Sequence, residues 1–296
     1  MTIVEKTLDK LESILEKGNL NFDYGFDIVN KNYFTGRNYL GLFNNITLSI
    51  AKDSLGYKFP YWIGFGQASK MYIPVRTGEH GIPIMCKQYK KRYYDGNGYE
   101  IEVEKGDSVD GLQYEENSYW TNVYVFNIEQ TSIDIESVNQ FDFNEDFTGI
   151  DNLLVKYMGR EKIALSESFD YCKYNKIKDV ISMVSKDSFY SKSAYYGSFA
   201  HECIHSTGHE NRLNRKLVPK SLDPNGYANE ELIAELGSML ILSEFEISSR
   251  ESSSGAYIKS WMHDKSIKEL YDFCTIAQKA VNFMKEGNKW KTLRTR

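Results

Sequence analysis

The chain of 296 residues has few cysteines and no long apolar run. Its four cysteines, Cys86, Cys172, Cys203 and Cys274, lie far apart, which excludes the paired spacing of a zinc knuckle and a disulfide framework. No run of about 18 apolar residues is present, so we expect no membrane-spanning helix and no membrane partner. The first 17 residues alternate charged with apolar side chains and contain no signal-peptide core. These absences predict a cytoplasmic protein.

The composition is that of a folded protein, because 41% of the residues are hydrophobic and only 26% are charged. The length allows one large domain or two ordinary domains. Between about residues 20 and 130, short apolar runs alternate with Gly, Asn and Pro, which predicts short strands, and beyond 150 the pattern is mostly helical. We therefore predict an α+β protein with a mixed α/β domain at 1–135, an acidic linker at 136–150 and a mainly helical domain at 151–296.

Three local patterns predict individual elements. The segment YDGNGYE at 94–100 is typical of the turn at the tip of a hairpin. Apolar residues at helical spacing predict scaffold helices over 253–263 and 266–286. No internal repeat is present in the sequence.

The net charge of −5 conceals an uneven distribution of charge along the chain. Residues 31–92 carry 10 basic and 2 acidic side chains, whereas residues 93–150 carry 1 basic and 14 acidic side chains. The basic segment is also rich in aromatic residues. Cations can follow a phosphate backbone while flat rings stack on unpaired bases. The alternative is that the rings form a core and the lysines a solvated face, and composition alone does not choose between them.

The motif His201-Glu202-Cys203-Ile204-His205 carries the strongest chemical signal. Residues four apart on a helix share one face, about 6 Å apart, so both imidazoles can reach one ion. Glu202 between them can then act as a general base toward water at that ion. Ser198 is a candidate N-cap of this helix, and Gly208 marks its end.

The third ligand must come from another segment. His209 shares the helix face but lies about 12 Å along the axis from His201, too far for one tetrahedral ion. A second helical segment contains Glu230, Glu231 and Glu235. Of these, Glu230 fits a helix's acidic first turn, whereas Glu231 and Glu235 adjoin apolar residues. One of these two could ligate the ion while the other hydrogen-bonds an imidazole, and spacing alone does not decide which. For Glu231 we favour a ligand role over an ordinary position on a buried helix.

Two tyrosines precede the motif. Tyr195 and Tyr196 could stabilise the oxyanion of a tetrahedral intermediate, and we single out Tyr196 as a candidate catalytic residue. Ordinary packing is the alternative for at least one of them.

The order of these motifs resembles that of the ArdC-type antirestriction proteins of plasmids, phages and conjugative elements, and the resemblance covers both halves of the chain. The matching segments are NxxTGRNYLGLFN (32–44), PYWIGFGQASK (60–70), IPVRTGEHGIPI (73–84), VYVFNIEQ (123–130), DVISMVSKDSFYSKSAYYGSFAHECIHSTGHENRLNR (179–215), YANEELIAELGSMLI (227–241) and AYIKSW (256–261).

This resemblance implies a single-stranded-DNA-binding N-terminal domain and a zincin-like metallopeptidase C-terminal domain in a bacterial cytoplasmic protein. In related zincins a glutamate of an ExxxD/E helix completes the metal site, which implies Glu231 as ligand with Glu235 behind it. It also favours the basic, aromatic segment as a DNA surface. The candidate DNA-binding residues are Lys31, Arg37, Tyr39, Lys58, Trp62, Lys70 and Arg76, and a place in the core is an equal alternative for Trp62.

We therefore expect an antirestriction protein that binds single-stranded DNA, holds Zn²⁺ through His201, His205 and Glu231, and cleaves an unknown protein substrate with Glu202 as base. Mn²⁺ or Co²⁺ could replace zinc, because geometry and availability decide between these ions. The rival is a DNA-binding protector without catalysis, in which the metal site is structural or vestigial. A purely structural site would be expected to have four protein ligands and would not need Glu202.

Overall fold

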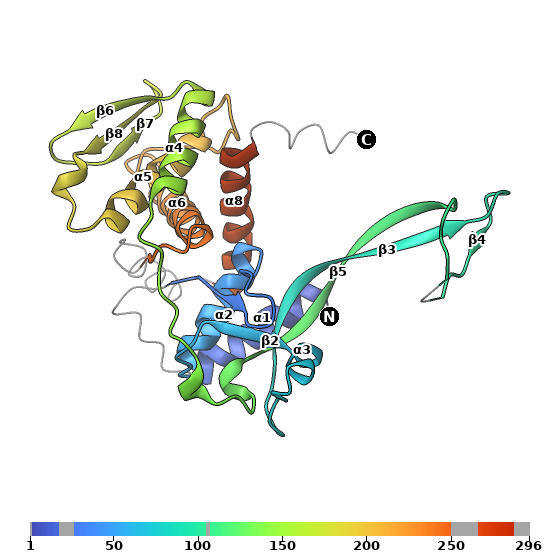
Figure 1. Ribbon diagram of the computed structural model, residues 1–296. Coiled ribbons are helices and arrows are strands. Elements are labelled where there is room, and N and C mark those ends of the chain that lie inside the picture. The colour runs from blue at the N-terminus through green and yellow to red at the C-terminus, as the bar shows by residue number, and fades with distance from the viewer. Residues whose placement is uncertain (1, 18–26, 105–106, 250–265, 287–296) are drawn as a thin grey trace.

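The computed structural model describes residues 2–17, 27–104, 107–249 and 266–286. The first part of the chain forms a curled five-stranded sheet with three helices (Figure 1). The strands follow the order β1-β2-β5-β3-β4, with β1 and β2 parallel and the other neighbours antiparallel. The elements are α1 (Ile3–Lys17), β1 (Lys31–Asn32), α2 (Leu42–Ser54), β2 (Tyr61–Gly64), α3 (Phe65–Lys70), β3 (Ile82–Tyr94), β4 (Glu100–Ile101) and β5 (Gln113–Asn127), followed by the short 3₁₀ helices η1 (Ile128–Gln130) and η2 (Ile135–Ser137).

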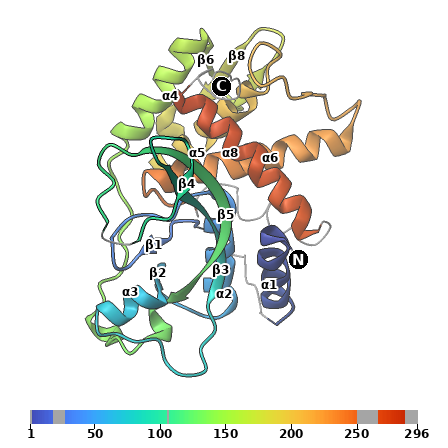
Figure 2. The same ribbon diagram turned by 90° about the vertical axis from the view of Figure 1, so that its right-hand side faces the viewer.

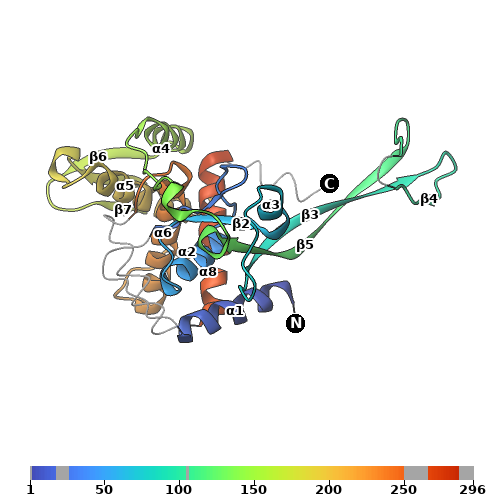
Figure 3. The ribbon, with the colours of Figure 1, turned by 60° about the horizontal axis from the view of Figure 1, so that its bottom comes forward.

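The long strands β3 and β5 form a two-stranded arm that projects from the body of the molecule (Figures 1 and 3). Their pairing runs from Ile82 opposite Val125 to Tyr94 opposite Gln113. Near the body, Ile82, Pro83 and Ile84 of β3 and Val125 and Asn127 of β5 are buried, and farther out most side chains are exposed. The short strand β4 pairs with the outer end of β3, so the predicted turn at 94–100 is confirmed as a hairpin tip.

The second part of the chain is mainly helical, as predicted, but it also contains a three-stranded sheet of order β6-β8-β7. We did not predict this sheet, because its strands are only three to five residues long and exposed at many positions. The elements are α4 (Thr148–Glu161), β6 (Ala164–Ser168), β7 (Lys173–Asn175), β8 (Val180–Val184), the 3₁₀ helix η3 (Lys186–Ser188), α5 (Lys192–Thr207), α6 (Pro224–Glu244) and α8 (Ile267–Glu286).

Helix α8 joins the two parts, because it packs against α5 and α6 and also against α1 and α2 (Figure 2). Leu8 and Leu11 of α1 and Phe43 of α2 lie in the same hydrophobic cluster as Leu236 of α6 and Cys274 of α8. The predicted helix at 266–286 is thus confirmed, and the one predicted at 253–263 lies outside the described residues.

None of the helices in the described ranges is both long enough and apolar enough to cross a bilayer.

Candidate metal centre

Helix α5 carries both histidines of the motif. Its N-cap is Ser191, whose side chain accepts a hydrogen bond from the Ala194 N–H at 3.1 Å, and Gly208 is its C-cap. Ser198 is therefore wrong as the N-cap, because the helix begins two turns earlier and Ser198 lies in its interior. The helical spacing brings Nε2 of His201 to 3.1 Å from Nε2 of His205.

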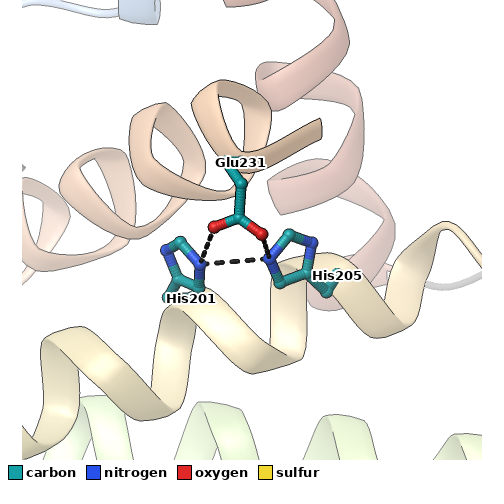
Figure 4. Close-up of side chains that lie close together, drawn as sticks. All are labelled: His201, His205 and Glu231. Carbon is teal, nitrogen blue, oxygen red and sulfur yellow. Dashed lines mark hydrogen bonds and ion pairs between the residues drawn. The ribbon is translucent and has the colours of Figure 1, made fainter. Parts of the chain in front are cut away.

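Helix α6 supplies the third donor. Asp223 caps this helix by accepting from the Gly226 N–H at 2.8 Å, and Pro224 occupies its first turn, where no N–H is required. The carboxylate of Glu231 lies between the two imidazoles, with its oxygens 3.4 Å from Nε2 of His201 and 3.5 Å from Nε2 of His205 (Figure 4). The structure therefore brings together the three predicted ligands, whose donor atoms all lie within 4.8 Å of one another.

The outer nitrogen of each imidazole faces a further carboxylate of α6. Nδ1 of His201 is 2.9 Å from Oε2 of Glu235, and Nδ1 of His205 is 3.2 Å from Oε1 of Glu230. A carboxylate on Nδ1 fixes the imidazole tautomer that leaves Nε2 free to bind a metal. The donor set of two such imidazoles and one carboxylate fits a divalent transition metal.

Glu230 has a second partner that sequence reasoning missed. Nη2 and Nε of Arg215 donate to its two carboxylate oxygens at 2.7 and 2.9 Å, and Nη1 of Arg215 donates to Oγ1 of Thr207 at 2.7 Å. Arg215 thereby ties the carboxylate that orients His205 to the end of α5. The helix dipole is wrong as an explanation for Glu230, because α6 begins at Pro224 and Glu230 lies beyond its first turn. No spacing rule connects Arg215 with Glu230.

The hydrogen bonds at the centre favour the charged forms of His201 and Glu231. Burial lowers the pKa of His201, but hydrogen bonds to Glu231 and Glu235 more than offset it and raise the pKa to about 10. Burial raises the pKa of Glu231, and the hydrogen bonds to His201 and His205 reverse this effect and lower it below its usual range. A proton on His201 therefore helps to balance the carboxylates, and a dication that binds here would displace that proton.

Glu202 lies beside the three donors without belonging to them. Its carboxylate is mostly buried, and its Oε2 accepts a hydrogen bond from the Tyr174 N–H on strand β7 at 2.6 Å. Glu202 lines a cavity of about 760 Å³ together with His201, His205 and Glu231. Strand β7 and the segment 217–220 also line this cavity, so Glu202 and the three donors face the same space.

The predicted catalytic residue Tyr196 lies elsewhere. Its hydroxyl donates to Oδ1 of Asp151 at 2.9 Å and accepts from Nζ of Lys186 at 2.8 Å, and it does not line the cavity. The five residues from Tyr196 to His201 turn the helix by about 500°, which places their side chains about 140° apart. Tyr195 packs edge-on against Phe189. The geometry thus favours packing for both tyrosines.

Trp62 requires a correction among the predicted DNA-binding residues. Its side chain is 0% exposed, and its indole N–H donates to Oδ1 of Asn30 at 2.8 Å. A ring inside the core cannot stack on a base, so Trp62 is a core residue.

The other candidate DNA-binding residues differ in exposure and in the partners that their side chains already have. Lys31 pairs with Glu246 at 2.8 Å, and Arg76 pairs with Glu79 at 3.3 Å. The hydroxyl of Tyr39 accepts from Nδ2 of Asn32 at 3.0 Å, and its ring packs against the core. The side chains that stay exposed are those of Arg37, Lys58, Lys70 and, in spite of its ion pair, Arg76.

Family models match both parts of the chain. Residues 2–126 match the N-terminal domain of anti-restriction factor ArdC, and residues 154–269 match a zincin-like metallopeptidase. Two curated relatives, both named DNA primase TraC from Escherichia coli, are 28% and 29% identical over 239 and 240 residues. The matches cover 79% and 80% of this chain but only 21% and 16% of the relatives, so the chain spans about a fifth of their length.

Solved structures with the same fold come from the antirestriction protein ArdC of plasmid R388. The metal-free structure has a TM-score of 0.62 and 24% identity, and the Mn(II)-bound structure has a TM-score of 0.60 and 23% identity. Each comparison covers 97% of this chain and 98% of the other. The likeness shows that this mixed α/β fold, with the zincin-like part at its C-terminal side, is shared.

Proposed function

Because family models of ArdC and of a zincin-like metallopeptidase together match both parts of this chain, we propose that it is an ArdC-type antirestriction protein that binds single-stranded DNA and carries a metal-dependent peptidase centre. The N-terminal family model and the relatives named as DNA primases support the nucleic-acid partner. The zincin-like model and the cluster of three donors support the peptidase.

His201, His205 and Glu231 would hold the ion. We propose Zn²⁺, which two imidazoles and one carboxylate suit well, while the related Mn(II)-bound structure supports Mn²⁺ as an alternative and Co²⁺ accepts the same donors. When bound, the ion would supply Lewis acidity, which acidifies water and polarises a peptide carbonyl. Glu235 and Glu230 would hold the two imidazoles in the tautomer that presents Nε2 to the ion.

Glu202 would act as the general base. It would accept a proton from the attacking water and then deliver that proton to the amine that leaves when the peptide bond breaks. The hydrogen bond from the Tyr174 N–H would hold its carboxylate in place for both transfers. The observation that carries the proposal is this carboxylate in the cavity of the three donors without a ligand role.

The variant Glu202→Gln tests this assignment. We expect it to bind Zn²⁺ as wild type does, because none of the three donors changes, and to lose at least about 100-fold in hydrolysis, the usual contribution of a general base. Metal binding would be measured by competition with a chromophoric chelator, and cleavage by mass spectrometry of a bacterial lysate with and without single-stranded DNA.

Glu210→Gln is the control, because Glu210 is an exposed glutamate just beyond α5. Undiminished cleavage by Glu202→Gln would refute the catalytic role. Absence of cleavage by wild type with any of the three metals would favour the rival, a DNA-binding protector whose metal site is structural.

A further inference from the structure

The outer part of the arm exposes aromatic rings on one side. In β3 and β5, residues directly opposite each other point to the same side, and neighbours along a strand alternate. Lys87 lies opposite Trp120 and Tyr89 opposite Ser118, so these residues share a side with Lys91 and Tyr114. We call this side the front face; its rings and lysines are Lys87, Tyr89, Lys91, Tyr114, Trp120 and Tyr124, and it also carries Tyr93, Ser118 and one acidic residue, Glu116.

The rings of the front face are open to solvent. The exposed fractions are 61% for Tyr89, 56% for Trp120, 53% for Tyr114 and 52% for Tyr124. Apolar surface of this kind is rarely left uncovered in a row unless it binds something. Because the arm stands away from the body (Figure 3), the described residues of the body do not bury these rings.

Lysines are interleaved with the rings. Nζ of Lys91 lies 4.0 Å from the ring centroid of Tyr114, and Nζ of Lys87 lies 5.4 Å from that of Tyr89. Neither lysine has a carboxylate within ion-pair distance among the described residues, although Glu116 stands opposite Lys91. Cations therefore alternate with rings along the front face.

A groove of about 400 Å³ continues this surface at the root of the arm. It is lined by Lys6 and Lys10 of α1, by His80, and by Tyr124 and Phe126 of β5. The hydrogen bond from Nδ2 of Asn122 to Oγ1 of Thr7, at 2.9 Å, fixes α1 beside the arm. Gly81 lies at the wall of the groove, where a Cβ would be 3.0 Å from the Phe126 ring, a tight contact.

We propose that the front face and this groove bind a single-stranded polynucleotide, with rings stacked on bases and lysines beside phosphates. Stacking contributes about 1–3 kcal/mol per base, and each lysine adds an electrostatic contact. Paired bases would not fit this surface, because a duplex covers the faces of its bases. This inference deepens the proposed single-stranded-DNA binding by naming its site, which contains none of the seven residues that the sequence suggested.

Negative charge limits the length of this site. Glu79 in the groove is paired with Arg76 and accepts from Nε2 of Gln130, so it is largely neutralised. The tip beyond Tyr94 carries only acidic charge among its described residues and would repel phosphates. These acidic residues are Asp95, Glu100, Glu102, Glu104, Asp107 and Asp110. The strand should therefore lie on the groove and the inner and middle arm, and stop before the tip.

The chain offers matched controls for a test. Tyr119 is a neighbour of Trp120 with a similar exposed fraction, 53%, but it pairs with Gln88 and points to the opposite side. Lys90 and Arg92 likewise alternate with Lys91 and point away from the front face. If binding depended only on the total number of rings or charges, substitutions on either side of the arm would weaken it equally. If the site lies on the front face, only substitutions on that face should weaken binding.

The experiment measures binding of full-length protein to fluorescent dT₁₅, the corresponding rU₁₅, and a 15-base-pair duplex by anisotropy at several salt concentrations. We expect Trp120→Ala to weaken dT₁₅ binding about 5- to 150-fold, the equivalent of one lost stacking contact, and Tyr119→Ala to change it less than twofold. The pair K87A/K91A should reduce the salt slope by about 1.4, the loss of two phosphate contacts on a single strand, and K90A/R92A should leave it unchanged. Similar affinity for rU₁₅ would fit the same stacking and phosphate contacts.

Each contrary result overturns a different claim. Tight dT₁₅ binding that both faces affect equally, or that neither affects, would refute this site while single-stranded-DNA binding stands. Absence of dT₁₅ binding by wild type at low salt would refute the proposed DNA function as well. Equal affinity for the duplex would refute the stacking argument. If Trp120→Ala instead converts a dimer to a monomer in analytical ultracentrifugation with no loss of dT₁₅ binding, the front face is an interface between copies.

Discussion

At the residue scale, the centre depends on carboxylates with three different tasks. Glu231 faces both imidazoles and can ligate an ion, and Glu235 and Glu230 each hydrogen-bond one imidazole. In the proposed function, Glu202 would move protons. Three of these four residues come from one helical segment, Glu230 to Glu235. All three have the same carboxylate group, so their different positions around the helix determine which imidazole atoms they face.

Glu235→Gln should therefore lower metal affinity without removing a ligand. Glu235 is buried and holds Nδ1 of His201, so its loss removes the acceptor that fixes that imidazole. We expect the Kd for Zn²⁺ to rise about 10- to 100-fold, the usual effect of losing such a partner. Chelator competition measures this, and Glu244→Gln, at the far end of α6, is the control. Unchanged affinity in Glu235→Gln would show that Glu235 does not position His201.

The raised pKa of His201 predicts how pH acts on stability without a metal. The pKa is about 10 in the folded chain and 6.5 ordinarily, so this histidine stabilises the fold fully below about pH 6.5 and loses that effect as the pH rises through 10. In the presence of a chelator, the difference in free energy of unfolding between wild type and His201→Ala should therefore shrink from pH 6 to pH 10.

Urea denaturation at several pH values measures this difference, in which titrations common to both proteins cancel. His209→Ala is the control, because His209 lies outside the donor cluster. A difference that stays constant or grows with pH would contradict the raised pKa. Metal affinity should show the opposite trend and rise with pH, because the ion competes with protons.

At the scale of elements, the distance between α5 and α6 sets the metal centre, and a glycine permits this distance. A Cβ on Gly237 would lie 2.8 Å from Cδ1 and Cγ1 of Ile204, which is next to His205 on α5. Such contacts are too short for an unchanged structure. The two helices can approach closely only because residue 237 has no side chain.

Gly237→Ala should therefore destabilise the protein by about 1–3 kcal/mol through overpacking, in spite of the better helix propensity of alanine, about 1 kcal/mol. Ile204→Val removes Cδ1 and should recover part of this loss when the two changes are combined. Gly159→Ala in α4 is the control, since its Cβ would meet nothing within 4 Å, and it should be neutral or stabilising. Chemical denaturation of the four proteins of the cycle measures the coupling, and strict additivity would contradict the direct contact.

At the scale of the whole molecule, the two parts of the chain that match different family models share one hydrophobic core. The backbone N–H of Leu42 donates to Oε1 of Gln278 at 3.0 Å, and the rings of Phe43 and Tyr271 pack edge-on at 5.1 Å. The predicted linker is also held, since the Asn144 N–H donates to the Glu246 carbonyl at 2.8 Å. The division into domains at 1–135 and 151–296 stays a prediction. The contacts between the two parts determine whether these parts unfold together.

The shared core predicts one cooperative unfolding transition despite the two family models. Far-UV circular dichroism and tryptophan fluorescence should give the same urea midpoint, because unfolding either part exposes the apolar residues of the other. A protease site inserted after Phe141, in a segment without helix or strand, should allow cleavage without separating the fragments in gel filtration. Two resolved midpoints, or dissociation after cleavage, would show instead that the parts fold independently.

The core of the metal centre can be predicted from the sequence. The spacing of His201, Glu202 and His205 is local, so helical periodicity alone predicts that the two imidazoles face one ion, and the order of motifs identified the family. The preference for Glu231 followed from its apolar neighbours and the family resemblance, and the structure brings it to the histidines.

The residues that support the centre, and the surfaces that remain exposed to solvent, depend on the tertiary structure. Arg215 reaches Glu230 across 15 residues, Trp62 is enclosed by packing, and Tyr196 is turned away. Tyr119 and Trp120 point to opposite sides of β5, and both sides are exposed because β3 and β5 project from the body as an arm. Periodicity along a chain specifies which residues share a face, but burial depends on what packs against that face, and that partner is distant in sequence.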